Sequence, residues 1–333
     1  MAELDLLTFG RLSLDLYALE EGPKASVRSF GAFIGGNPLN VAVGAARLGL
    51  RAGLVSAVGQ DPVGEFVLER LRGEGVEVQH VLVKPGRRTP AVVLFREGGT
   101  YPLTFYREGA ADWEISLEDV EGIPVEATRV LFISGTALAR EPSRSAAFAL
   151  AERARNAGVQ VFLDLDLRPD QWHDPRAYGV VLRSFLPLVE VAIGNEKEAR
   201  ALRARGIRLV AHQASEPEVE GDLDRAIGEV LGAGVEAFVV KGGERGSGVW
   251  LRSGESLWVP GFPVERPVTP LGAGDAFAAG LVWARLQGLS WGDALRVGNA
   301  CGAIVVGRLG CGEFSPYREE LLGFLRERGV HVD

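Results

Sequence analysis

Apolar residues occur along the chain in two different spacings, and segments with one spacing alternate with segments with the other. Short runs of consecutive apolar residues, often ended by Gly or Pro, are typical of buried β-strands. Longer segments with apolar residues three and four apart are typical of helices that cover a sheet. The strand-like runs lie at residues 4–10, 52–58, 130–136, 159–168, 188–193 and 237–240, and the helix-like segments at 41–48, 64–73, 143–156, 276–286, 290–296 and 297–306. This alternation predicts an α/β fold with a mostly parallel sheet that has helices on both faces.

Further strand-like runs predict a second, smaller sheet. Residues 89–96 and 101–107 are rich in β-forming residues, and the four residues between them include two glycines, which is a hairpin signal. Together with a run near 27–34, they predict a small sheet drawn from approximately residues 12–35 and 88–112, which we expect to act as a lid. The chain contains no internal repeat and no long linker, so we expect residues 1–333 to form a single domain.

Composition and charge exclude several classes of protein. The chain has 333 residues, of which 47% are hydrophobic, so it can bury a large core. The net charge of −8 argues against nucleic acid as the main partner. No apolar run approaches the ~20 residues that cross a membrane, so we expect no membrane partner. The two cysteines, Cys301 and Cys311, fit no zinc spacing, and we expect reduced thiols in a cytoplasmic protein.

The candidate chemistry centres on residues 268–280. Gly272, Ala273, Gly274 and Asp275 stand where an apolar helix is expected to begin. Unpaired N–H groups at a helix start carry partial positive charge, and glycine lets a ligand approach the backbone, so this segment predicts an anion hole suited to phosphate. A carboxylate there repels phosphate, but it is explained if Asp275 is a general base that takes a proton from an attacking hydroxyl. The alternative is a plain helix cap.

A second glycine-rich segment also precedes a helix. Gly35 and Gly36 are followed by Asn37 and Asn40, without the G-x-x-x-x-G-K-[S/T] pattern of a nucleotide-binding P-loop. The Asn amides donate and accept hydrogen bonds, as polyol recognition requires, whereas the alternative is a helix N-cap. Asp15 follows the first strand, at the sheet edge where α/β proteins bind ligands. It is a candidate acceptor for sugar hydroxyls, with a solvated loop residue as the alternative.

Two arginines complete the candidate substrate site. Arg107 ends the second run of the small sheet, and Arg168 follows Asp166 at the end of the 159–168 run. Because side chains alternate along a strand, Asp166 and Arg168 are expected on the same face. A guanidinium can hold a carboxylate or a phosphate by two parallel hydrogen bonds. For Arg107 the alternative is an ordinary surface arginine.

The segment from Gly272 to Asp275, followed by Ala-Phe, resembles the signature of the ribokinase-like (PfkB) carbohydrate kinases, and the resemblance extends from Gly10 to about Gly312. It implies a three-layer α/β/α fold with a small β-sheet lid, Asp275 as the catalytic base, and an anion hole at Gly272, Ala273 and Gly274. It also implies sugar binding by the Gly35, Gly36 and Asn40 element, ATP binding near Asn195, Lys241, Gly243, Gly246 and Asn299, and Mg²⁺ organised through water by Glu198. On spacing alone, Asn195 and Glu198 also suit a capped helix start, and the glycines after Lys241 suit a tight hairpin.

Other stretches, including residues 10–17, 105–112 and 164–169, resemble the members of this family that phosphorylate 5-dehydro-2-deoxygluconate in inositol catabolism. Family members that act on 2-keto-3-deoxygluconate share Arg107 and Arg168. The resemblance therefore implies a sugar acid and ATP as small-molecule partners, and a homodimer is expected. Thr269 and Pro270 replace the usual Asp-Thr pair of a monovalent-cation site, so activation by K⁺ is not implied. The competing interpretations are a ribokinase, fructokinase or nucleoside kinase of the same fold, and a sugar-acid sensor without enzymatic activity.

Overall fold

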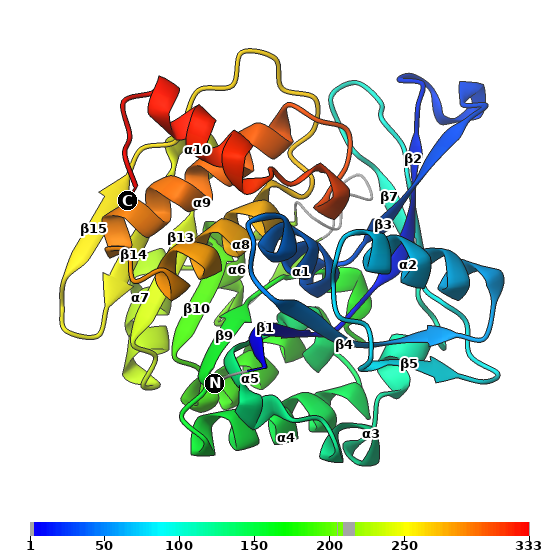
Figure 1. The fold of residues 1–333 in the computed structure, drawn as a ribbon, viewed down its shortest axis with the longest axis horizontal. Coiled ribbons are helices and arrows are strands. Elements are labelled where there is room, and N and C mark those ends of the chain that lie inside the picture. Colours follow the sequence, from blue (N-terminus) through cyan, green and yellow to red (C-terminus); the bar gives the residue numbers. More distant parts are fainter. Residues whose placement is uncertain (1–2, 205, 209–216, 333) are drawn as a thin grey trace.

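The computed structural model describes residues 3–204, 206–208 and 217–332, and nine of the described strands form one main sheet (Figure 1). In spatial order they are β15 (Ser256–Val259), β14 (Ser247–Leu251), β13 (Ala237–Lys241), β10 (Val191–Asn195), β9 (Gln160–Asp164), β8 (Thr128–Ser134), β1 (Leu4–Phe9), β4 (Ala52–Gly59) and β5 (Val81–Lys84). Neighbouring strands from β13 to β5 run parallel, whereas β14 and β15 run antiparallel to their neighbours. The predicted mostly parallel sheet is confirmed.

Helices cover both faces of the main sheet and give the three layers of an α/β/α fold (Figure 1). Along β8, Leu131 packs into one buried cluster and its neighbours Val130 and Phe132 into another, because successive side chains of a strand point to opposite faces. On the Val130 side lie α1 (Asn37–Arg47), α2 (Pro62–Gly73), α8 (Ala273–Leu286), α9 (Trp291–Val306) and α10 (Arg318–Glu327), and on the Leu131 side α3 (Leu117–Glu121), α4 (Ser143–Asn156), α5 (Pro175–Phe185), α6 (Glu196–Ala201) and α7 (Leu223–Gly232). The predicted three-layer architecture is confirmed.

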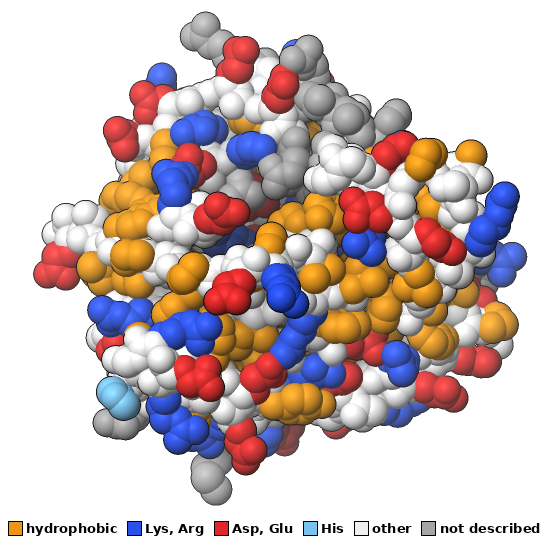
Figure 2. Space-filling model, turned by 90° about the horizontal axis from the view of Figure 1, so that it is seen from above, with side chains coloured by type: hydrophobic (Ala, Val, Ile, Leu, Met, Phe, Trp, Pro, Cys, Tyr) orange, Lys and Arg blue, Asp and Glu red, His pale blue; other side chains and the backbone are white. Residues whose placement is uncertain are grey.

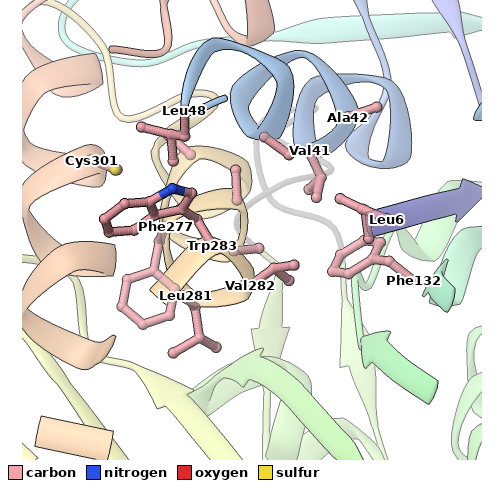
Figure 3. Close-up of a cluster of buried hydrophobic side chains, with 14 of the residues drawn as sticks. Leu6, Val41, Ala42, Leu48, Phe132, Phe277, Leu281, Val282, Trp283 and Cys301 are labelled. Carbon is pink, nitrogen blue, oxygen red and sulfur yellow. The ribbon is translucent and has the colours of Figure 1, made fainter. Parts of the chain in front are cut away.

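The contact between α1 and α8 joins the two glycine-rich segments that the sequence singles out. Figure 3 shows buried side chains of these helices, among them Val41 and Trp283, in the same cluster as side chains of β1 and β8. A Cβ atom added at Gly44 of α1 would lie 2.7 Å from the Cβ atom of Ala279 of α8. Small residues therefore allow the two helices to pack closely, which holds their first turns beside each other.

A second sheet stands beside the main one, with strands in the order β3 (Phe30–Gly35), β2 (Ser13–Ala18), β6 (Ala91–Leu94) and β7 (Leu103–Tyr106) (Figure 1). Its strands come from the two predicted segments, and β6 and β7 form the predicted antiparallel hairpin. Tyr17 and Leu94 of this sheet pack with Cys311, so one face of the small sheet is buried. Its movement as a lid stays a prediction, as does the single-domain organisation. Two short strands, β11 (Ile207–Arg208) and β12 (Glu218–Val219), pair separately.

The predicted strand at 159–168 is shorter in the structure. β9 ends at Asp164, and Asp166 has a φ of 37°, in the left-handed region that a strand does not use. The interpretation that strand alternation places Asp166 and Arg168 on one face was therefore wrong. The two side chains nevertheless meet, because Nη2 of Arg168 lies 3.0 Å from Oδ1 of Asp166. An ion pair in a loop, not a strand face, brings them together.

The apolar character of the helices and the charge of the surface concern two possible partners, a membrane and a nucleic acid. Within residues 3–204, 206–208 and 217–332, no helix combines the length and the apolar character needed to cross a membrane. Figure 2 shows Lys and Arg side chains interspersed with Asp and Glu side chains over the face that it draws. That face does not carry the continuous basic patch that nucleic-acid binding uses.

Candidate active site

Helix α8 begins at the segment predicted to bind an anion. Gly272 is its N-cap, with a φ of 78°, and a Cβ atom there would lie 2.7 Å from Cα of Cys311. Both the left-handed conformation and the lack of space require glycine at this position. The N–H of Ala273 donates to the carbonyl of Pro270 over 3.3 Å, but in the described part of the chain no backbone carbonyl accepts from the N–H of Gly274. The first turn thus keeps donor capacity for an anionic ligand.

Asp275 lies in this first turn and is held by amides from the start of α1. Nδ2 of Asn40 donates to Oδ2 of Asp275 over 2.7 Å, and Nδ2 of Asn37 donates to Oδ1 over 2.8 Å. Burial raises the pKa of Asp275 to about 6, and the negative charges of Asp166 and Asp164 act in the same direction. A carboxylate with this pKa is ionised at neutral pH and still basic enough to accept a proton. The geometry therefore suits a general base.

Lys241 places a positive charge beside the same turn. It is the last residue of β13, and its Nζ lies 3.0 Å from Oδ2 of Asp164 at the end of β9. A Cβ atom added at Gly274 would lie 3.3 Å from this Nζ, so the ammonium group faces the first turn of α8. Burial lowers the pKa of Lys241, but the charges of Asp164 and Glu198 outweigh it, and the net pKa is raised. Lys241 is therefore a permanent cation next to the predicted anion hole.

Asn195 and Glu198 form the reciprocal cap of α6. The side chain of Asn195 accepts from the N–H of Glu198 over 2.9 Å, and Oε2 of Glu198 accepts from the N–H of Asn195 over 2.7 Å. The capping arrangement that their spacing allows is thus present. Oε1 of Glu198 also accepts from the N–H of Leu167 over 3.3 Å. Burial raises the pKa of Glu198 to about 7, opposed by the charge of Lys241. Whether Glu198 also organises Mg²⁺ stays a prediction.

A cavity opens between the small sheet and the starts of α1 and α8. It brings together six of the predicted site residues, which come from distant parts of the chain, namely Asp15, Gly36, Asn40, Arg168, Gly272 and Asp275. Strands of the small sheet, the loops that follow β1 and β9, both helix starts and the segment after α9 line it. They are Arg11, Asp15, Tyr17, Gly36, Asn37, Asn40, Val92, Leu94, Leu103, Phe105, Arg168, Leu271, Gly272, Asp275 and Cys311. The cavity thus places polar side chains and an apolar wall from the small sheet around one space beside Asp275.

Asp15 and the glycine pair fit tightly together on the small-sheet side. Asp15 is buried on β2, and Ser13 donates to its Oδ1 over 2.7 Å. A Cβ atom at Gly35 would lie 2.1 Å from Oδ2 of Asp15, and one at Gly36 would lie 2.2 Å from the carbonyl oxygen of Arg11. Burial raises the pKa of Asp15, against the opposing charge of Arg11. The glycines therefore make room for a polar group that faces the cavity.

The two predicted arginines have different surroundings. Arg168 lines the cavity and is paired with Asp166. Arg107 does not line it: Nε of Arg107 donates to Oδ2 of Asp112 over 2.9 Å, and its guanidinium lies 4.3 Å from the ring centroid of Trp113. Only 2% of its side chain is exposed. The structure therefore does not bring Arg107 and Arg168 together at the cavity, and a clamp formed by this pair stays a prediction.

The remaining predicted nucleotide residues surround the β13–β14 hairpin. Gly243 and Gly246 have positive φ values of 62° and 98°, which the tight turn requires. Asn299 of α9 accepts from Oγ of Ser247 over 2.9 Å and donates to the carbonyls of Val259 and Pro260. Its amide thus fastens α9 to the hairpin. Nucleotide contact by these residues stays a prediction.

Sequence reasoning gave no role to two residues that the structure places at the site. Arg11 lines the cavity from the loop between β1 and β2, and Asp164 pairs with Lys241. Arg11 lies two residues after the end of β1, and Asp164 is the last residue of β9. This end of the strands is where open α/β sheets bind ligands. That rule applied to every polar residue near a strand end would have included them among many candidates.

A buried base and a permanent cation at a helix start, beside a cavity on a three-layer α/β/α fold, define a phosphotransferase. Residues 3–318 match the family model described as the pfkB family of carbohydrate kinases. The chain belongs to this family, and it is a sugar kinase that transfers a phosphoryl group to a sugar hydroxyl.

Relatives support this assignment over nearly the whole chain. A 5-dehydro-2-deoxygluconokinase of Clostridium tetani is 31% identical over 98% of this chain and 94% of its own length, and one of Geobacillus thermodenitrificans is 30% identical over 97% and 93%. An Escherichia coli structure assigned as ribokinase II, in complex with ATP and Mg²⁺, has a TM-score of 0.85 and 25% identity, covering 97% of this chain and 99% of its own. A fructokinase double mutant of Vibrio cholerae, bound to fructose, ADP and a potassium ion, has a TM-score of 0.81 and 27% identity, covering 98% and 99%.

Proposed function

We propose that this sugar kinase transfers the γ-phosphoryl group of ATP to the terminal hydroxyl of a keto-deoxy sugar acid, with 5-dehydro-2-deoxygluconate as the first candidate. The relatives from Clostridium tetani and Geobacillus thermodenitrificans bear the name of that activity. The cavity beside Asp275 is lined by guanidinium groups, which suit a carboxylate better than a neutral sugar. The specific substrate is the part of the proposal that most needs a test.

The observation that carries the proposal is the position of Asp275. Its carboxylate faces a cavity, is oriented by the amides of Asn37 and Asn40, and stands in the first turn of α8 near Lys241. In the proposed step the hydroxyl oxygen attacks the γ-phosphorus, its proton passes to Asp275, and the bond to the β–γ bridging oxygen breaks to release ADP. The α8 amides and Lys241 stabilise negative charge on the transferred group.

Mg²⁺ is the proposed metal, since the Escherichia coli relative holds ATP together with it. Carboxylate oxygens are the ligands that Mg²⁺ prefers, and Asp164 and Glu198 supply such oxygens beside Lys241. These residues therefore fit a site that would hold the ion through water next to the phosphates. When bound, Mg²⁺ neutralises charge on the phosphates of ATP.

A homodimer in the cytoplasm is the proposed state of the protein. On the small sheet, Phe30 and Tyr106 are 39% and 62% exposed, and the nearby Leu19 is 48% exposed, an apolar surface that suits a second copy. Cys301 and Cys311 are buried free thiols, in keeping with a reducing compartment.

The test of the proposed function is ATP turnover with Mg²⁺ against 5-dehydro-2-deoxygluconate, 2-keto-3-deoxygluconate, ribose, fructose and adenosine. We expect the highest kcat/KM for 5-dehydro-2-deoxygluconate. A preference for 2-keto-3-deoxygluconate would keep the sugar acid but change its identity. A preference for ribose, fructose or adenosine would refute the sugar-acid proposal. Binding of a sugar acid without ATP turnover would contradict the proposed catalytic step and favour the sensor.

A further inference from the structure

Arg11 stands out among the arginines near the cavity because it is buried without an ionic partner. Only 9% of the residue is exposed, and it lies in the loop that joins β1 of the main sheet to β2 of the small sheet. Its Nη1 donates to Oγ of Ser13 over 2.7 Å, and its guanidinium lies 5.0 Å from the ring centroid of Phe105. Among the described residues, the side chain of Arg11 has these two contacts and no ion pair with a carboxylate.

The two other candidate arginines are already neutralised. Arg107 is paired with Asp112, and Arg168 with Asp166. Asp15 and Asp166 are near enough for the charge of Arg11 to affect their pKa, but neither forms an ion pair with it. A buried charge without a partner is unfavourable, so a ligand that supplies an anion at Arg11 gains both the ionic contact and the relief of that penalty.

We propose that Arg11 is the residue that selects the carboxylate of the substrate, an inference that rests on the proposed function. Arg11 and Asp275 line the same cavity from different parts of the fold, the loop before the small sheet and the start of α8. A substrate with its terminal hydroxyl at Asp275 extends its other end along the cavity, where the guanidinium binds the carboxylate through two hydrogen bonds. Ser13 links Arg11 to Asp15 by hydrogen bonds, and the ring of Phe105 lies beside the guanidinium.

The experiment compares the sugar acid with a matched neutral ketose in which a hydroxymethyl group replaces the carboxylate. In Arg11→Gln, kcat/KM for the acid is expected to fall about 100-fold, while that for the ketose changes less than about threefold, because only the acid loses a charged contact. Arg11→Lys keeps the charge without the two-pronged geometry, and an intermediate loss of about tenfold is expected. The control Arg28→Gln removes an exposed arginine before β3, and kcat/KM for both substrates is expected to stay unchanged.

Two further measurements separate selection from a structural role. Thermal unfolding with and without the acid reports binding directly: the acid is expected to stabilise the wild type and not Arg11→Gln. Ser13→Ala removes the link to Asp15 but keeps the guanidinium, so the preference for the acid is expected to persist. If Arg11→Gln lowered kcat/KM for the acid and the ketose equally, Arg11 would only support Asp15 and the inference would be wrong. If Arg11→Gln does not fold, the same comparison of kcat/KM for the acid and the ketose is made with Arg11→Lys.

Failure of this inference and failure of the proposed function give different results. If the wild type prefers the acid and the Arg11→Gln variant keeps that preference, only the proposed role of Arg11 is wrong. A wild type that prefers the neutral ketose overturns both.

Discussion

Replacing Asp275 by Asn tests the base and its effect on stability in one variant. Burial, with the charges of Asp166 and Asp164, raises the pKa of this carboxyl from 3.8 to about 6. At about 1.36 kcal/mol per pKa unit, the ionised side chain destabilises the folded protein by about 3 kcal/mol above pH 6. The sign follows from the raised pKa: the protonated carboxyl adds stability below pH 3.8, and this stability is lost as the pH rises through about 6.

The Asp275→Asn variant would also lose a hydrogen bond. The amides of Asn37 and Asn40 both donate to the carboxylate, but an Asn side chain offers a single acceptor oxygen, so one of these bonds is lost at a cost of about 1 kcal/mol. The variant is therefore expected to be about 2 kcal/mol more stable than the wild type at pH 8, which raises Tm by about 3 °C. Below pH 4 the wild-type carboxyl is protonated and the penalty of about 3 kcal/mol is absent. Only the lost hydrogen bond then remains, so the variant should be less stable than the wild type by about 1 kcal/mol.

Activity should change in the opposite direction. A positioned general base contributes about 10²- to 10⁴-fold to the rate, so kcat of Asp275→Asn is expected to fall about 10³-fold with a small change in KM. In the wild type, kcat/KM should rise with pH through about 6 and then level off, because Asp275 must be ionised to accept a proton. A coupled assay of ADP release between pH 5 and 8.5 measures both quantities.

Either of two results would refute this reasoning. Near-wild-type kcat in Asp275→Asn would mean that another group takes the proton. A variant less stable than the wild type at pH 8 would mean that the two asparagine amides stabilise the ionised carboxylate more than burial and the neighbouring charges destabilise it.

Three further predictions concern the surroundings of Asp275. Lys241→Met should lower kcat at least about 100-fold and lower Tm, because Asp164 loses its buried ion-pair partner; an unchanged Tm would contradict the structural half of this expectation. Gly272→Ala should reduce both stability and kcat, since a Cβ atom there would lie 2.7 Å from Cα of Cys311 and φ is 78°, and a wild-type melting curve would show that the turn can relax. Exchanging KCl for NaCl should leave the initial rate unchanged, because Thr269 stands where the family has an Asp; at least a tenfold activation by K⁺ would disprove this.

Much of the fold could be predicted because local pattern and tertiary structure agree along this chain. The strands of the main sheet are buried on both faces, so each reads as a continuous apolar run, and each helix that covers them has an apolar stripe. The hairpin of β6 and β7 was predictable from its two glycines. The position of Asp275 beside a cavity could be inferred because a carboxylate is unexpected among residues that suit an anion hole.

The partners of the site residues could not be predicted in the same way. Asn37 and Asn40 suggested sugar binding or a helix cap, whereas the structure has both donating to Asp275 more than 230 residues later, a contact without a signal in local sequence. Arg107 was expected at the substrate, and its ion pair with Asp112 could not be predicted, because the free energy of a buried charge depends on tertiary neighbours. Arg11 was missed because a single polar residue after a strand carries little information until the cavity is seen.

The hydrogen bonds to Asp275 have a consequence for the synthesis of the protein on the ribosome. Asn40 donates to Asp275 and accepts from the N–H of Gly312 over 3.1 Å, so one early side chain joins two segments that are translated much later. A nascent chain can complete β1, α1 and the small sheet long before α8 leaves the exit tunnel. The base and the groups that orient it therefore come together only near the end of translation. A chain that stops before α8 lacks both this carboxylate and the helix against which α1 packs.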